Sequence, residues 1–172
     1  LRIVGEDLPR ARTDTLVLDL PAGPDAVPDE RVVLSAHIDG HPLAESALDN
    51  ATGVAAAIAL ARAFAPRMHA MRRGLTVCLF SAEEWALNGS REWLAALPEA
   101  RRAAMALNVN LDSLAGSPRL TALTSGFARL GEFARSGASL AGGALGVHLP
   151  LMSNSDHANF AACGIPALRL IA

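Results

Sequence analysis

The chain has 172 residues and a mass of 17.9 kDa, which suits one compact domain with its own hydrophobic core. Hydrophobic residues make up 51% and charged residues 19%, which excludes a disordered chain, and the net charge of −2 gives no sign of a nucleic-acid-binding surface. All 15 basic residues are arginine, so Schiff-base chemistry on lysine is excluded. The longest apolar runs fall far short of the roughly 20 residues that span a bilayer.

Apolar runs alternate with helical patterns along the chain. In chain order, the sequence predicts a strand at 16–20, a strand at 31–37, a helix at 52–65, a strand at 74–81, a helix at 89–97, strands at 107–112 and 120–123, a helix at 127–140, a strand at 147–149, a helix at 156–162 and a strand at 167–171. Several of these strands are apolar throughout, which is typical of a parallel sheet covered on both faces. The pattern therefore predicts one α/β domain.

Acidic and imidazole side chains stand where the predicted buried strands end. They are His37, Asp39 and Asp49 after the strand at 31–37, Glu83 and Glu84 after the strand at 74–81, and Asp112 at the end of the strand at 107–112. Ligands bind at the carboxyl ends of strands in such sheets, so we expect these side chains to converge. Carboxylates and imidazoles without a thiolate form a ligand set that suits zinc, manganese or cobalt.

The spacing of these residues suggests a division of roles. Asp49 is the candidate carboxylate to bridge two dications, which lie about 3.5–4 Å apart in two-metal sites. Asp39, two residues after His37, is the candidate partner that fixes the tautomer of that histidine. Of the adjacent Glu83 and Glu84, one can bind a metal while the other takes a proton from water. Each feature alone is more typical of a surface turn or a helix cap, and only their combined order indicates a site.

Six segments carry a resemblance to a known family: residues 34–39, 46–54, 80–90, 110–112, 155–160 and 164–167. In them the chain resembles the co-catalytic zinc exopeptidases, which include bacterial leucine aminopeptidases, glutamate carboxypeptidases and glutaminyl cyclases. The resemblance runs from about residue 15 to the end. It implies a three-layer α/β/α fold with a mixed, mainly parallel central sheet. It also implies a single catalytic domain over residues 1–172 that lacks its C-terminal end, and a cis peptide between Asp49 and Asn50.

The resemblance assigns metal ligands. It implies that His37, Asp49 and Asp112 hold one zinc ion, and that Asp49 and Glu84 hold a second. A further histidine ligand of the second ion is expected downstream of residues 164–167, and the sequence contains none there. Three explanations stay open: truncation of the chain, which leaves one ion in this fragment, loss of the ligand in this branch, or replacement by His157.

The catalytic roles follow from the same resemblance. Glu83 is expected to be the general base, and Asp39 is expected to orient His37. Asp156 and His157 are expected to line the substrate pocket. Many relatives use a tyrosine to stabilise the oxyanion, and this chain has none. Zinc itself, or Asn154 or His157, would then take that role.

These roles imply a zinc-dependent exopeptidase, in the first place an aminopeptidase acting on a peptide or amino-acyl amide. The alternatives are a glutaminyl-cyclase-like acyltransferase, a carboxypeptidase or amide hydrolase of the same fold, and a metal-deficient domain that only binds a partner. We expect Cys78 and Cys163 to be free and buried, which slightly favours the cytoplasm. The first residue is Leu1 rather than methionine, so a secreted or periplasmic location also stays open, and the oligomeric state is not predicted.

Overall fold

The computed structural model describes residues 12–172, in which seven strands form one sheet. The strands are β1 (Leu16–Leu20), β2 (Arg31–His37), β3 (Gly74–Phe80), β4 (Met105–Leu111), β5 (Thr121–Leu123), β6 (Gly146–His148) and β7 (Ala167–Ile171). The helices are α1 (Thr52–Phe64), α2 (Asn88–Ala96), α3 (Glu99–Ala103), α4 (Ala128–Leu140) and α5 (His157–Ala162). A π-type turn over Ala47–Ala51 precedes α1, and a 3-10 helix over Ala65–Ala70 follows it.

The sheet is mixed and has the order β1-β3-β2-β4-β7-β5-β6. The central strands β3, β2, β4 and β7 run parallel to one another, and β5 runs parallel to β6. Two pairs are antiparallel, β1 with β3 and β5 with β7. The predicted three-layer fold with a mixed, mainly parallel sheet is therefore confirmed. Because the four central strands are parallel, their carboxyl ends meet at one edge of the sheet.

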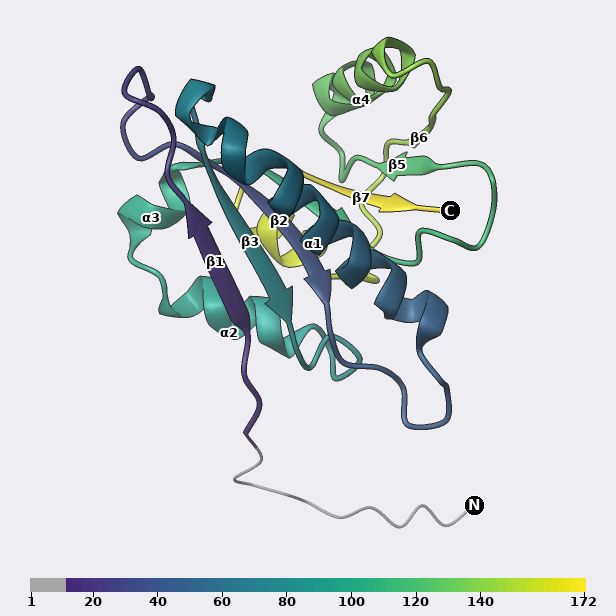
Figure 1. Cartoon of the computed structure of the whole chain (residues 1–172). Coiled ribbons are helices and arrows are strands. Elements are labelled where there is room, and N and C mark those ends of the chain that lie inside the picture. The colour runs from purple at the N-terminus through teal and green to yellow at the C-terminus, as the bar shows by residue number, and fades with distance from the viewer. Residues whose placement is uncertain (1–11) are drawn as a thin grey trace.

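Helices cover both faces of the sheet (Figure 1). Helix α1 crosses the front of the sheet, whereas α2 and the yellow α5 lie behind it. Within α1, the small residues Ala57 and Ala61 are buried, which lets the helix pack closely on Leu34 and Val77 of the strands below. Within residues 12–172, no helix is both long enough and apolar enough to cross a membrane.

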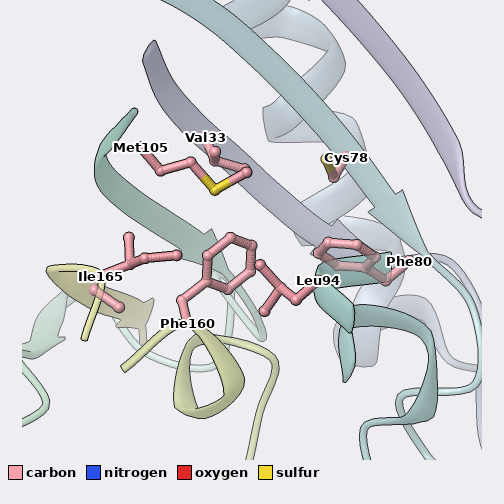
Figure 2. Close-up of a cluster of buried hydrophobic side chains, with 8 residues drawn as sticks. Val33, Cys78, Phe80, Leu94, Met105, Phe160 and Ile165 are labelled. Atoms are coloured by element: carbon pink, nitrogen blue, oxygen red, sulfur yellow. The ribbon is translucent and has the colours of Figure 1, made fainter. Parts of the chain in front are cut away.

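The core behind the sheet is built around aromatic side chains (Figure 2). Its buried members are Val33, Cys78, Phe80, Leu94, Met105, Phe160, Ile165 and Ala167. Phe80 lies 5.6 Å from Trp93 and 6.2 Å from Phe160 between ring centroids, so β3, α2 and α5 are packed through these rings. Phe80 is the last residue of β3, and its carbonyl accepts a hydrogen bond of 2.7 Å from the amide of Ile38. This core therefore supports the strand ends that carry the predicted site.

Two details differ from the predictions. Cys78 is buried and free, as expected, but the free Cys163 is exposed, because it ends the six-residue α5 on the outer side of the fold. The predicted helix at 52–65 is followed directly by a 3-10 helix through Pro66, since proline is tolerated in the first turn of a new helical segment.

Candidate metal centre

Three of the predicted ligands lie together at the carboxyl edge of the sheet. His37 ends β2, Asp112 follows β4, and Asp49 stands in the turn before α1. One ligand atom of each lies within 4.8 Å of the others. His37 Nε2 is 2.9 Å from Asp49 Oδ1 and 3.7 Å from Asp112 Oδ1. The side chains of His37 and Asp112 are buried, whereas that of Asp49 is 53% exposed, so the centre opens to solvent on the Asp49 side.

The imidazole of His37 is held by the backbone. Its Nδ1 lies 3.0 Å from the carbonyl oxygen of Asp39, which can only accept, so Nδ1 donates this hydrogen bond. The sequence predicts that the Asp39 carboxylate makes this contact, but that carboxylate lies farther away, at 3.5 Å. The orienting residue is the predicted one, although the orienting atom is its carbonyl. Nε2 consequently faces Asp49 and Asp112.

The carboxylate of Asp39 positions the two glutamates. Its Oδ1 accepts a hydrogen bond of 3.1 Å from the amide of Glu83, and its Oδ2 accepts one of 3.2 Å from the amide of Glu84. The segment after β3 is thereby fixed to the segment after β2. Glu84 lies half-buried in that segment, but its carboxylate does not join the group of His37, Asp49 and Asp112 in the part of the chain that the structure describes.

Glu83 is 8% exposed and sits in a negatively charged environment. Burial raises the pKa of Glu83, the nearby positive charge of His37 opposes this, and Asp156 and Asp112 raise it further, to about 7. A carboxyl group that titrates near neutral pH is suited to accept and return a proton. This property fits the predicted role of general base.

Asn50 joins the two carboxylate-bearing segments. The peptide bond between Asp49 and Asn50 is cis, as the resemblance implies. Asn50 Nδ2 donates a hydrogen bond of 2.9 Å to the carbonyl of Leu111, the last residue of β4, and its Oδ1 accepts from the amides of Gly53 and Ser113. A Cβ atom on Gly53 would lie 2.2 Å from the Leu111 carbonyl oxygen, so only glycine fits there. The turn that holds Asp49 is thus fastened to the strand end that holds Asp112.

A buried chain of hydrogen bonds leads to Asp112, and the sequence pattern did not predict it. Each side chain donates to the next over 2.6 to 2.9 Å, in the order Asn108, Ser35, Asn110, Ser155 and Asp112 Oδ2. All five residues are buried. Hydrogen bonds that point one way along a chain polarise one another, so this arrangement strengthens the last bond, to Asp112. The signal in the sequence was the alternation of asparagines with apolar residues in β4.

Arg169 is a second feature that the sequence pattern did not predict. It is 5% exposed, and its Nη2 lies 3.2 Å from Asp112 Oδ2. Burial alone would raise the pKa of Asp112, but His37, Arg169 and Ser155 outweigh burial and hold this pKa below its usual value. A charged residue inside the apolar strand β7 was the visible signal.

A comparison with protein families gives one clear result, because the model of peptidase family M28 matches residues 16–172. The chain belongs to peptidase family M28. The family predicted from the six segments is therefore confirmed. A search of curated protein sequences found no match.

Solved structures share the fold of this M28 chain. An aminopeptidase from Aneurinibacillus sp. strain AM-1 gives a TM-score of 0.81 at 25% identity, over 91% of this chain and 38% of that one. The zinc aminopeptidase BSAP from Bacillus subtilis gives 0.78 at 24% identity, over 91% of this chain and 39% of that one. A glutaminyl cyclase from an Acidobacteriales bacterium gives 0.75 at 17% identity, over 92% and 58% respectively. The M28 chain thus spans well under two thirds of the length of these relatives.

Asp156 and His157 begin the segment of α5, directly after Ser155 of the buried chain. Both side chains are fully buried, and within the described residues neither the Asp156 oxygens nor the His157 ring nitrogens have a hydrogen-bond partner. Burial raises the pKa of Asp156 to about 6. Burial and the charge of Arg169 lower the pKa of His157 to about 4, so this imidazole is neutral at pH 7. His157 does not join the group of His37, Asp49 and Asp112, so its predicted role as a substitute ligand stays a prediction.

The donor atoms of this M28 centre fit a zinc ion. One imidazole nitrogen and two carboxylates lie in one group, a donor set that zinc accepts. Burial would lower the pKa of His37, but Asp112, Glu83 and Asp49 raise it to about 10. The carboxylates therefore favour a positive charge at the position of this imidazole. A dication bound by the same groups would satisfy them in place of the proton.

The raised pKa of His37 predicts how the stability of the metal-free protein depends on pH. The folded state binds this proton more tightly than the unfolded chain, whose histidine titrates near 6.5, so its stabilising effect is complete below 6.5 and is lost as the pH rises through about 10. Glu83 acts in the same direction from its unfolded value of 4.5 to about 7. We expect the free energy of unfolding, measured with urea in the presence of EDTA, to fall between pH 6.5 and pH 10.

Two variants separate this effect from a general loss of stability. His37→Gln is expected to flatten the decline above pH 7, whereas the same change at the exposed His148 leaves the decline unchanged. Saturating zinc is expected to abolish the decline of the unfolding free energy with pH, because the metal displaces the proton from His37. An unfolding free energy that rises or stays level from pH 6.5 to pH 10 in EDTA would contradict the prediction.

Proposed function

We propose that this M28 domain is a zinc-dependent aminopeptidase that releases the N-terminal residue of peptides or amino-acyl amides. The observation that carries the proposal is the meeting of His37, Asp49 and Asp112 at the strand ends, with the buried Glu83 beside them. The family supports a metal-dependent peptidase type of activity. The finer assignment to the N-terminal bond rests on the charge of the site.

In this proposal His37, Asp49 and Asp112 hold one zinc ion, and Asp49 and Glu84 contribute to a second. Zinc in such a site polarises the scissile carbonyl and makes water a nucleophile near neutral pH. His37 presents Nε2 because Asp39 accepts the hydrogen bond from Nδ1. Asp49 is more exposed than the other two ligands, which suits a group shared by two ions at the mouth of the site. Manganese or cobalt would suit the same donors.

Glu83 is the proposed general base. Its carboxylate takes a proton from the attacking water as the new carbon–oxygen bond forms. It then gives that proton to the leaving nitrogen as the carbon–nitrogen bond breaks, which yields a free amino acid and the shortened peptide. In the metal-free protein, burial and the neighbouring carboxylates raise the pKa of Glu83 to about 7, so this carboxyl can take up and release a proton near neutral pH. The hydrogen bond from the Glu83 amide to Asp39 keeps the residue in place through both transfers.

The charge of the site supports action at the amino end of the substrate. The carboxylates of Asp39 and Asp49 lie 3.5 and 2.9 Å from the ring of His37, and the negative charges of Asp156 and Glu84 act on Glu83. An excess of negative charge attracts an α-ammonium group and repels an α-carboxylate. Arg169, the buried cation beside the centre, is already paired with Asp112. The electrostatics thus favour an aminopeptidase over a carboxypeptidase.

The test compares three substrates on the purified, zinc-loaded protein. Leucine p-nitroanilide is expected to be hydrolysed, and EDTA is expected to abolish the reaction. N-acetyl-leucine p-nitroanilide, which lacks the α-ammonium group, is expected to react at a rate at least about 100-fold lower, since a site built for a polar group discriminates strongly against its absence. Equal hydrolysis of the acetylated substrate would overturn the amino-end assignment. Cyclisation of a glutamine-initiated peptide without hydrolysis of the first substrate would favour the acyltransferase alternative.

A further inference from the structure

The two oxygens of the Asp112 carboxylate face different groups. Its Oδ1 faces His37 Nε2 at 3.7 Å, on the side of the proposed zinc ion. Its Oδ2 accepts the Ser155 hydroxyl at 2.6 Å and lies 3.2 Å from Arg169 Nη2. Oδ1 also accepts a hydrogen bond of 3.1 Å from the hydroxyl of Ser113, so both oxygens accept a hydroxyl. They differ in that Oδ1 faces the other proposed ligands, whereas Oδ2 is paired with a guanidinium. A fixed cation and a metal ion would lie on opposite sides of the same carboxylate.

Arg169 is placed there by the sheet itself. Its neighbours Leu168 and Leu170 face the α1 and α4 side, so alternation along β7 turns Arg169 to the opposite face, where α5 packs. In the sheet Arg169 is paired with Asn110 of β4, a member of the buried hydrogen-bond chain. Its Nη1 donates a hydrogen bond of 3.2 Å to the carbonyl of Asn154, and its Nε has no partner among the described residues. A guanidinium this deeply buried is costly unless a carboxylate pairs with it, and Asp112 is that carboxylate.

We propose that Arg169 is the resident counter-ion of Asp112 and weakens the binding of the metal ion that shares this carboxylate. The inference rests on the proposed metal centre. When the centre is empty, Arg169 compensates the charge of Asp112 and keeps the buried carboxylate in its ionised form. When a dication binds at Oδ1, it meets the repulsion of a fixed positive charge across one carboxyl group, in an interior where such repulsion is weakly screened. Arg169 is thus a positioning residue that sets the metal affinity of the centre.

The direction in which zinc affinity changes when Arg169 is removed distinguishes competition with the metal from simple orientation of Asp112. If Arg169 only orients Asp112, its removal should loosen the ligand, and loss of such outer contacts weakens metal binding by about 10–100-fold. If Arg169 competes with the metal, its removal should tighten binding. The two roles thus predict opposite changes in the same measured quantity.

The experiment measures the zinc dissociation constant of the purified protein at pH 7.5 by competition with a chromophoric chelator. Arg169→Met is expected to bind zinc at least about tenfold more tightly than the wild type. Arg169→Lys keeps a charge at the same place and is expected to restore an affinity within about threefold of the wild type. Arg135→Met removes an exposed arginine of α4 and is expected to leave the affinity unchanged. Weaker or unchanged zinc binding by Arg169→Met would overturn the inference.

Stability measurements keep the inference testable if the methionine variant folds poorly without metal. Because zinc binds the folded state, its affinity also appears as a gain in unfolding free energy over EDTA. The gain is expected to be larger for Arg169→Met, and for the more polar Arg169→Gln, than for the wild type. A gain smaller than that of the wild type overturns it. If the wild type binds no zinc, the metal centre itself is overturned. If the wild type and Arg169→Met bind zinc with equal affinity, only the role of Arg169 is overturned.

Discussion

Asp49→Asn is expected to remove zinc from the purified protein and to abolish its hydrolytic activity. Asp49 lies 2.9 Å from His37 Nε2 and is the carboxylate proposed to contact both ions. Asparagine keeps the size of the side chain but loses the charge that holds a dication. We expect a loss of more than about 100-fold in zinc affinity, because the loss of outer contacts alone costs about 10–100-fold. Zinc content after gel filtration and the hydrolysis of leucine p-nitroanilide measure the two effects.

The matched control is Asp25→Asn, which makes the same chemical change in an exposed loop far from the centre. This variant is expected to keep both zinc and activity. Asp49 also helps to hold the positive charge of His37 in the metal-free protein, so we expect the change at this position to lower the free energy of unfolding in EDTA. The folded state of the variant is therefore checked before its zinc content is measured. An Asp49→Asn protein that is folded and keeps its zinc would contradict the ligand assignment.

The strands and the residues at their ends could be predicted because they leave a local pattern. Apolar runs and the polar residue that closes each one place His37 at the end of β2 and Asp112 just after β4 within one residue of the observed bounds. The rule that ligands gather at the carboxyl ends of parallel strands then brings them together without any knowledge of the coordinates. The structure puts ligand atoms of both residues, with Asp49, within 4.8 Å of one another.

The supporting contacts could not be predicted because they join residues far apart in the chain. Arg169 pairs with Asp112 across 57 positions, and nothing in the local sequence of β7 names its partner. Asn50 has the sequence signature of a helix cap, and it does bind the amide of Gly53, but its bond to Leu111 depends on the packing of α1 against β4. Side-chain choices of this kind are decided by tertiary packing. Periodicity therefore cannot predict them.

The contacts of Asp39 show the same limit over a short stretch of chain, because its carbonyl, and not its carboxylate, accepts the hydrogen bond from His37. Spacing alone could indicate that Asp39 orients His37, because the two residues are separated by one position. It could not indicate that the carbonyl does so while the carboxylate binds the amides of Glu83 and Glu84. That division follows from the pairing of β2 with β3, which ends at His37 and Phe80 and brings the two following segments together.

Glu83→Gln is expected to lower kcat for leucine p-nitroanilide by about 10²–10⁴-fold, the usual contribution of a general base. Glutamine has nearly the same shape and keeps the backbone amide that donates to Asp39, so the segment should stay in place. It has no group that can accept a proton from the attacking water near neutral pH. Since burial already disfavours the charged form of Glu83, the neutral replacement is not expected to lower the free energy of unfolding at pH 8.

The zinc content decides how a loss of activity in Glu83→Gln is interpreted. The proposed ligands are His37, Asp49, Asp112 and Glu84, so removing the charge of Glu83 should leave the zinc content of the protein unchanged. Glu92→Gln, on the exposed side of α2, is the matched control and should retain both zinc and activity. If Glu83→Gln loses zinc together with activity, Glu83 is a ligand and the division of roles between the two glutamates is wrong. If it keeps zinc and its kcat is unchanged, another group takes the proton, and the fully buried Asp156, with a pKa of about 6, would be the next carboxyl to test in the same way.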